Sequence, residues 1–382
     1  MKSNVTKKVF KVVRKIMLSF FVVLLFFVLP LFSPYNEDLS VMYGVFVGKK
    51  SEFQGMLEIW NVDTFESGTA SKSSFLSYAS KEFQKNHKGL YFMIRNVSKQ
   101  ELVNLLEIGE KPDLISCSYG VAESVKAELK PFSKNVSLQK DFLEAGKLEG
   151  KQFGLAWCYG IYFLISTPEK LEQAGVDDVE KFDIINKALT LGFEKKLKKE
   201  TKKVYSLSVG FGDFLLPQMA LRSYNNIEEP AKGDLCVNQE RSAQSQYLAY
   251  SRFVSGESVM LLGSQRDIFR MEQRVNQGKI QSVISTPLCE FTDLVQFMFL
   301  CETGNSIKEK IAEEFSYFLL SKQIQKKISR IGMFSPVISP KEMYKQGVIC
   351  DILPEKFSVN IKNDVFLTET EIAGLREKFK LF

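Results

Sequence analysis

The chain has little of the chemistry on which metal sites and cysteine-based enzymes depend. It contains a single histidine, His87, and its six cysteines include no CxxC pair. A zinc site needs clustered cysteine, histidine or carboxylate ligands, and a nucleophilic cysteine needs a neighbouring base such as histidine. We therefore predict no metal ion, no cofactor and no catalytic residue. The sequence also has no internal repeat and no long low-complexity tract.

The chain carries no net positive charge once the first residues are set aside. The formal net charge is +6, and six basic residues precede Glu37, the first acid: Lys2, Lys7, Lys8, Lys11, Arg14 and Lys15. Subtracting these six positive charges from the net charge of +6 leaves the rest of the chain near neutral. Nucleic-acid-binding domains carry basic patches that contact the phosphate backbone. The global charge gives no reason to expect a nucleic-acid partner, and none is predicted.

The basic start is followed by an apolar run from Ile16 to Phe32. This pattern is typical of an export signal or a membrane anchor. A run of about 17 residues is short for a bilayer span and long for a signal peptide, so its length leaves both open. A small-x-small cleavage site is missing and Pro34 is an awkward residue after a scissile bond. We expect an uncleaved anchor over residues 1–34, a tether over 35–54, and the remainder on the extracellular face of the membrane, or secreted if cleavage occurs.

The six cysteines are spread over the exported part of the chain. Cys117, Cys158 and Cys289 lie in apolar, strand-like segments, which is typical of small buried side chains. An extracellular location permits disulfides. One or two remain possible, and their connectivity cannot be read from the sequence.

Strand-like and helix-like segments alternate after residue 55. We expect strands at Met56–Trp60, Leu90–Val97 and Pro112–Ser118, with helices at Ser71–Asn86 and after Ser98. Such alternation favours right-handed βαβ units and a mainly parallel sheet. Ligands of these sheets gather at the carboxyl ends of the strands. The loop after Trp60 is therefore a candidate binding segment.

The second half of the chain continues the pattern. We expect a helix after Pro168, a lysine-rich helical segment with a solvated face over Asp177–Lys203, and a strand at Gly256–Leu262. That strand opens into Gly263–Asp267, which begins a further helix whose first amides can bind an anionic or polyhydroxyl group. An amphipathic helix is expected over Ile307–Leu320.

The order of several weak motifs resembles the extracellular sugar-binding proteins of ABC importers. The motifs are LEIWNVDTF, KPDLISCSYG, GKQFGLAWCYGIYFLISTPEKLEQAGV, GESVMLLGSQRD and IAEEFSYFLLSKQIQKKISRIGMFSPV, within residues 55–338. The resemblance implies an α/β, two-lobe, periplasmic-binding-protein-like fold of type II, in which each lobe is a mainly parallel sheet flanked by helices and a hinge joins the lobes. Lobe 1 is expected to begin with residues 55–160 and lobe 2 to span 161–300. Late helices and a tail would follow over 301–382.

Two features depart from that family. Its Gram-positive members commonly carry a lipid-modified cysteine after the apolar segment, whereas the first cysteine here is Cys117. A helical anchor would replace the lipid. The region Asp177–Gly212 carries lysine-rich sequence in place of the Pro-x-Thr-Trp-like helix start of sugar binders, which bears on sugar specificity more than on the fold.

The resemblance implies a non-enzymatic protein that captures a small molecule, a sugar or oligosaccharide, and delivers it to ABC permease subunits. Aromatic faces stack on the C–H surfaces of sugars, while acids, amides and arginines hydrogen-bond their hydroxyls. The candidate ligand-binding residues are Trp60, Asp63, Phe65, Glu66, Trp157, Tyr159, Gln265, Arg266 and Asp267.

Each candidate residue also has a structural alternative. Trp60, Trp157 and Tyr159 would also suit the core, the acids of the first loop could cap a helix, and Asp267 could pair with Arg266. Two alternative functions stay open as well. One is a membrane-anchored sensor or scaffold with the same fold, and the other is an extracellular glycosidase-like enzyme with paired carboxylates.

Overall fold

The structure is a computed structural model that describes residues 50–134, 136–174, 193–197, 200–210, 212, 214–225, 245–353 and 359–378. The expected anchor over 1–34, residues 35–49 of the expected tether, and Cys236 lie outside these ranges. Within them, no helix combines the length and the apolar character that a bilayer crossing requires.

Two compact units divide the chain. The smaller consists of Met1–Gly55 and Lys81–Tyr91. In it, the His87 ring stacks on Phe83 with 3.8 Å between the ring centroids. The larger consists of Met56–Ser80 and Phe92–Phe382, and it contains the cavities described below.

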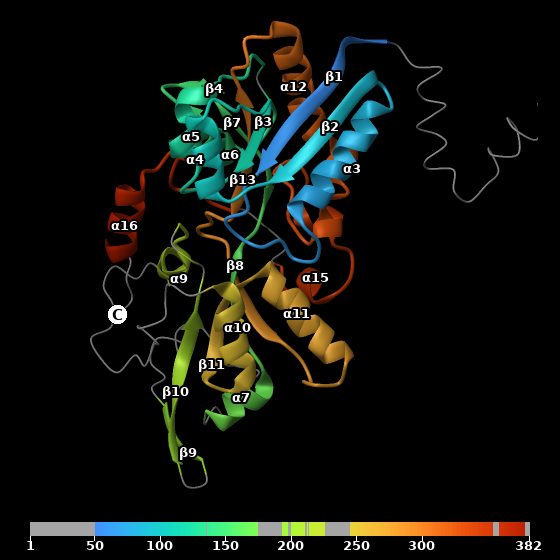
Figure 1. Cartoon of the computed structure of the whole chain (residues 1–382). Coiled ribbons are helices and arrows are strands. Elements are labelled where there is room, and N and C mark those ends of the chain that lie inside the picture. The colour runs from blue at the N-terminus through green and yellow to red at the C-terminus, as the bar shows by residue number, and fades with distance from the viewer. Residues whose placement is uncertain are drawn as a thin grey trace, which may run out of the picture. The chain divides into compact units, whose positions relative to one another are not determined.

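The first sheet has the strand order β2-β1-β3-β13-β4, with β7 paired to β13 (Figure 1). Its strands are β1 (Lys50–Asn61), β2 (Lys88–Asn96), β3 (Leu114–Cys117), β4 (Leu129–Lys130), β7 (Gly154–Tyr159) and β13 (Val295–Cys301). β1 runs parallel to β3, with Trp60 opposite Ile115. All residues of β3, β7 and β13 are buried, which explains their continuous apolar sequence.

The second sheet has the order β12-β8-β11-β10-β9. Its strands are β8 (Tyr162–Ser166), β9 (Phe193–Leu197), β10 (Glu200–Val209), β11 (Ser258–Ser264) and β12 (Ile284–Leu288). β10 and β11 are parallel, whereas β8 runs antiparallel to both β11 and β12. A small hairpin of β5 (Lys147–Leu148) and β6 (Lys151–Gln152) stands apart from both sheets.

The helices begin where the sequence supplies capping side chains. Ser98 accepts a hydrogen bond from the Glu101 amide at the start of α4, and Thr167 accepts one from Lys170 at the start of α7. The described helices are α3 (Lys72–Gln84), α4 (Lys99–Glu107), α5 (Ala122–Val125), α6 (Lys140–Ala145), α7 (Pro168–Gln173), α9 (Pro217–Asn225), α10 (Gln246–Ser255), α11 (Gln265–Asn276), α12 (Ser306–Leu319), α13 (Lys322–Gln325), α14 (Pro340–Met343), α15 (Val348–Ile352) and α16 (Glu369–Lys378).

Two expectations about the sheets were wrong. Each sheet is mixed rather than mainly parallel, because β13 enters the first sheet antiparallel to β3 and β8 enters the second antiparallel to β11. The lysine-rich segment was expected to be helical, yet its described part forms the β9–β10 hairpin, with Lys195 opposite Lys202. Pairing with the sheet overrides the helix propensity of lysine.

The chain crosses between the sheets twice, from β7 to β8 and from β12 back to β13. The Gly160 amide in the first crossing donates to the carbonyl of Leu294 in the second, at 2.7 Å. The two crossings therefore lie side by side, as a hinge requires. The segment boundaries expected at residues 160 and 300 remain predictions.

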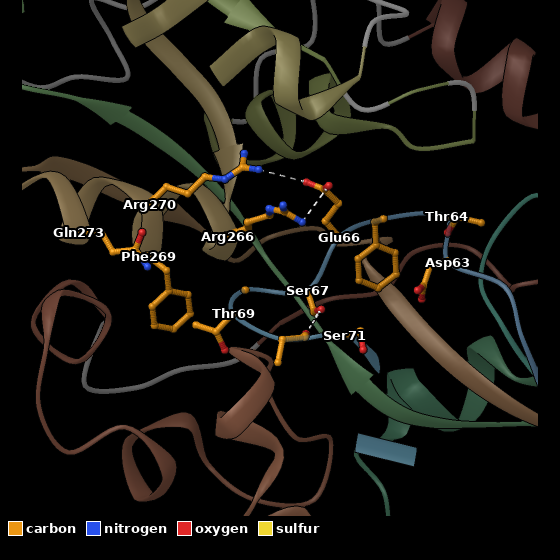
Figure 2. A pocket seen from close by; sticks show the side chains of 13 residues that line it. Asp63, Thr64, Glu66, Ser67, Thr69, Ser71, Arg266, Phe269, Arg270 and Gln273 are labelled. Carbon is orange, nitrogen blue, oxygen red and sulfur yellow. Dashed lines mark hydrogen bonds and ion pairs between the residues drawn. The ribbon is translucent and has the colours of Figure 1, made fainter. Parts of the chain in front are cut away.

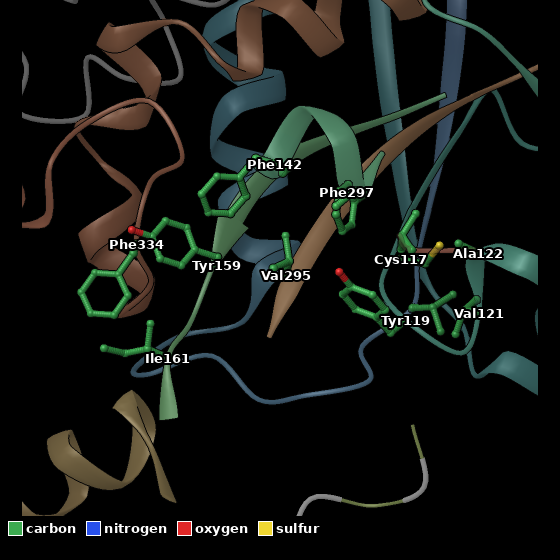
Figure 3. Packing of buried hydrophobic residues seen from close by; sticks show 14 of the residues in the cluster. Cys117, Tyr119, Val121, Ala122, Phe142, Tyr159, Ile161, Val295, Phe297 and Phe334 are labelled. Carbon is green, nitrogen blue, oxygen red and sulfur yellow. The ribbon is translucent and has the colours of Figure 1, made fainter. Parts of the chain in front are cut away.

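One buried cluster of hydrophobic side chains includes residues from both sheets. At its centre, the Tyr159 ring lies 4.8 Å from Phe142 and 5.6 Å from Phe334, centroid to centroid (Figure 3). The five described cysteines are free.

Candidate functional site

A cavity of about 620 Å³ lies between the loop that follows β1 and one face of α11. The loop contributes residues 63–71, and α11 contributes Arg266, Phe269, Arg270 and Gln273. Figure 2 shows these two walls facing each other. The loop lies at the carboxyl end of β1, where the topology of an α/β sheet predicts ligand approach.

The buried Lys72 side chain holds one end of the loop through contacts with Asp63 and Phe65. Its side chain is 1% exposed, and its ammonium lies 3.0 Å from the Asp63 carboxylate and 2.5 Å from the Phe65 carbonyl oxygen. The same ammonium lies 3.8 Å from the centre of the Phe65 ring. A cation in the first turn of α3 opposes the helix dipole, so Asp63 compensates a charge that would otherwise be costly to bury.

The other end of the loop is attached to a turn after α13. The Thr69 amide donates to the Ile331 carbonyl at 3.1 Å, and its hydroxyl donates to the Arg330 carbonyl at 2.9 Å. Gly68 packs directly on Gly332, and a β-carbon at Gly68 would lie only 2.5 Å from the Gly332 oxygen. The loop is therefore held at both ends.

The opposite wall is positioned by a capping box at the start of α11. Ser264 is the N-cap, and the buried Asp267 carboxylate accepts from the Ser264 amide at 3.0 Å. Burial raises the pKa of Asp267, while a hydrogen bond from Gln246 opposes that rise. From this cap, residues 266, 269, 270 and 273 follow the i, i+3, i+4, i+7 spacing of one helix face, which places all four on the cavity.

Ion pairs connect the two walls. Glu66 in the loop lies 2.8 Å from Arg266 and 3.7 Å from Arg270. Arg270 also lies 3.3 Å from Asp267 and 4.9 Å from the centre of the Tyr250 ring. Burial lowers the pKa of Arg266, and the Glu66 carboxylate acts in the opposite direction.

A smaller cavity of about 230 Å³ adjoins the first and shares Thr64, Phe65 and Glu66 with it. Its far side includes Tyr247, which is 63% exposed. The Arg270 guanidinium lies 5.8 Å from the centre of the Tyr247 ring. Glu66 thus lines both neighbouring cavities.

Four of the residues expected to bind ligand line the main cavity: Asp63, Phe65, Glu66 and Arg266. The loop and the start of α11 were each expected to bind ligand. Their position in the cavity wall is compatible with ligand contact, which stays a prediction.

The other five expected residues are buried, with exposures of 1% or less: Trp60, Trp157, Tyr159, Gln265 and Asp267. Trp157 was expected to bind ligand, with a place in the core as the alternative. Its ring instead stacks on Phe75 at 5.7 Å, and its indole nitrogen donates to Ser116 at 3.3 Å. The structure places these five side chains in the core, with no exposed surface for a ligand in this conformation, and their contact with a ligand stays a prediction.

Each of the other buried residues also has a structural partner. Trp60 donates to the Glu58 carboxylate at 2.6 Å, and the Gln265 side-chain oxygen accepts from the Ile161 amide at 3.2 Å. Tyr159 forms an isolated β-bridge with Phe334.

Phe269, Arg270 and Gln273 were missed by the sequence reading, which ended at the start of α11. The helical spacing that continues from Arg266 was the available signal. Tyr247 carried no such signal, because it lies on a different helix, α10, and reaches the site only through the fold.

No protein-family model matches the chain, and no curated protein matches it. Solved structures do match. The GacH receptor of Streptomyces glaucescens, determined unliganded and with acarbose, aligns at a TM-score of 0.56 and 12% identity, over 86% of this chain and 99% of that chain. An ABC substrate-binding protein from Listeria monocytogenes in complex with cycloalternan aligns at 0.54 and 13% identity, over 86% and 97%.

The same fold also occurs in an enzyme. Thiaminase I from Bacillus thiaminolyticus aligns at a TM-score of 0.53 and 13% identity, over 86% of this chain and 98% of that chain. At such identities the similarities show the fold alone. They confirm the expected α/β, two-lobe, periplasmic-binding-protein-like fold of type II.

Proposed function

We propose that this protein is an extracellular solute-binding protein that captures a carbohydrate between the β1–α3 loop and α11 and delivers it to the permease subunits of an ABC importer. The observation that carries the proposal is the cavity of about 620 Å³ whose walls come from the β1–α3 loop and α11. The carbohydrate complexes among the structural neighbours support it.

The residues on the walls suit a sugar. Carboxylates, guanidinium groups and the Gln273 amide can hydrogen-bond ring hydroxyls, and the partly exposed Phe269 ring offers apolar surface to C–H groups. A pocket of several hundred Å³ is in the range that encloses a small ligand. Ligand contacts to both walls would favour the closed arrangement of the lobes, with the paired crossings acting as the hinge.

Residues 1–34 supply the proposed membrane anchor, which would keep the binding lobes near the permease on the outer face of the membrane. The pattern of a basic start and an apolar run supports this part of the proposal. An anchor that holds the protein at the membrane raises its effective concentration near the permease.

A catalytic role has less support. The thiols of Cys117 and Cys158 are fully buried, and burial raises the pKa of both. A protonated thiol is a poor nucleophile. The described residues that line the main cavity include no cysteine and no histidine.

A thermal-shift panel tests the proposal. Purified full-length chain is heated with maltotriose, mannotriose, chitotriose and oligouronates, and with thiamine and free amino acids as the contrasting classes. A carbohydrate at 100 times its Kd should stabilise the chain by about 2.7 kcal/mol. A shift with thiamine or an amino acid and with no carbohydrate would reject the proposal.

A further inference from the structure

Two arginines on successive turns of α11 point toward the same cavity, in the half of the helix where positive charge is least favourable. Arg266 is in the first turn and Arg270 follows four residues later. Like charges at this spacing repel each other, and the helix dipole adds to the positive potential. The Asp267 side chain offsets only part of this charge, because it is 0% exposed and lies 3.3 Å from Arg270.

Glu66 supplies the remaining negative charge, but only one of its carboxylate oxygens has a close partner. One carboxylate oxygen lies 2.8 Å from Arg266. The other lies 3.7 Å from Arg270, is buried, and has no hydrogen-bond partner among the described residues. The neighbouring Thr64 hydroxyl oxygen, which belongs to a residue of the cavity wall, is likewise buried without a partner. Two guanidinium groups could hold a carboxylate with hydrogen bonds to both oxygens.

We propose that the ligand is an acidic saccharide, and that the carboxylate of a uronate ring displaces Glu66 and binds between Arg266 and Arg270. Glu66 is then an internal substitute that neutralises the arginines while the site is empty. It belongs to the loop wall and the arginines belong to the helix wall, so displacement exchanges an ion pair between protein side chains for one between protein and ligand. This inference rests on the proposed function and specifies its substrate class.

The displacement also accounts for the arrangement of the neighbouring groups. The Arg270 guanidinium lies 4.9 Å from the centre of the Tyr250 ring and 5.8 Å from that of Tyr247, and neither ring neutralises its charge. Gln273, one turn further along α11, is available for the hydroxyls of the same or the next ring. A neutral sugar would leave Glu66 where it is and use only these hydroxyl contacts.

Isothermal titration calorimetry on the full-length chain tests the inference. The probes are trigalacturonate, trimannuronate and triglucuronate, each as the free acid and as the methyl ester, which keeps the ring and removes the charge. We expect at least one acid to bind about tenfold or more tighter than its ester, a difference of about 1.4 kcal/mol or more. Higher salt should weaken the binding of the acid more than the binding of the ester.

Substitutions separate the roles of the charged groups. Arg270→Ala and Arg266→Ala should each reduce the affinity for the acid about tenfold, and Arg270→Lys should recover part of it, while the ester is unaffected. Glu66→Gln should strengthen binding of the acid, because it removes the competing carboxylate. Arg95→Ala is the matched control, since Arg95 forms a comparable 2.7 Å pair with Glu101 outside the lining of the cavity.

The outcomes distinguish this inference from the proposed function. If a neutral trisaccharide binds and no uronate acid binds better than its ester, the inference fails and the proposed function stands. If no carbohydrate of either kind binds, both fail. Weaker acid binding by Glu66→Gln would also overturn the inference, because Glu66 would then be a ligand contact rather than a substitute.

Discussion

The hydroxyl of Thr292 donates a 2.8 Å hydrogen bond to the carbonyl oxygen of Gly160, and it accepts one of 3.1 Å from the Leu294 amide. Thr292 belongs to the crossing from β12 to β13, and Gly160 to the crossing from β7 to β8. One buried side chain therefore joins the two segments that connect the two sheets.

Replacing Thr292 with valine should destabilise the protein. Valine preserves the shape, but it leaves the Gly160 carbonyl and the Leu294 amide without the partners that Thr292 provides. A buried polar group without a partner costs about 1–3 kcal/mol. We expect urea unfolding to show a loss in this range. Thr370→Val is the control, because Thr370 is exposed on α16, and it should change stability by less than about 0.5 kcal/mol. Equal effects of the two substitutions would contradict the structural role of Thr292.

Asp293, the next residue in the crossing, should make stability depend on pH. Burial raises its pKa to about 6, although Tyr162 and the Leu216 amide donate to its carboxylate at 2.5 and 2.7 Å. Because the folded state binds the proton more tightly than the unfolded chain, this group stabilises the fold as pH falls through 6 and loses that contribution above it.

The comparison with Asp293→Asn isolates this effect. The free energy of unfolding of the wild type, minus that of the variant, should rise by about 1 kcal/mol between pH 7 and pH 5. Urea titrations of both proteins at pH 7, 6 and 5 measure it. A difference that stays constant or falls toward pH 5 would show that Asp293 does not titrate in this range.

The fluorescence of the two tryptophans should report a buried environment. Trp60 and Trp157 are the only tryptophans in the chain, and both are 1% exposed or less. Iodide should quench the native emission several-fold less than the emission in urea. The single variants Trp60→Phe and Trp157→Phe assign the signal to each residue. Strong quenching of Trp157 in the native protein would return it to the cleft.

Gly68→Ala should disturb the loop wall of the cavity. An added β-carbon would lie 2.5 Å from the Gly332 carbonyl oxygen and 2.6 Å from the Phe269 ring. The loop must move, so we expect a lower melting temperature and weaker ligand binding. Gly374→Ala is the matched control, because a β-carbon there meets nothing within 4 Å. In the helix α16 this change should stabilise by about 0.5–1 kcal/mol. Unchanged binding by Gly68→Ala would show that the position of the loop does not control the site.

Local sequence signals were enough to find the elements that form the cavity. Ser98 and Pro168 marked helix starts, and the sequence singled out both the loop after Trp60 and the helix start at Gly263–Asp267. These features depend on residues that are close together in the chain, so they can be recognised in a single sequence. The same reading placed Asp63, Phe65, Glu66 and Arg266 at the cavity.

The burial of the other candidate residues depends on partners that are distant in the chain. Trp157 is in the core because Phe75, 82 residues earlier in the sequence (157 − 75), covers its ring. The lysine-rich segment is a hairpin because β11 pairs with β10. Propensity and periodicity contain no information about such pairings. Arg270 was within reach of the sequence, through the helical spacing that follows Arg266.

The central claim is that the cavity between the β1–α3 loop and α11 is the ligand site. Calorimetric titration of Gln273→Trp with the best saccharide of the panel tests it most directly, because Gln273 is exposed at the cavity wall and a large ring there should obstruct entry without disturbing the core. The control is Gln277→Trp, which places the same ring one turn further along α11, at its exposed C-cap. We expect Gln273→Trp to lower affinity by more than about tenfold, or 1.4 kcal/mol, and the control to bind as the wild type does. Wild-type affinity in Gln273→Trp would place the ligand elsewhere and contradict the account.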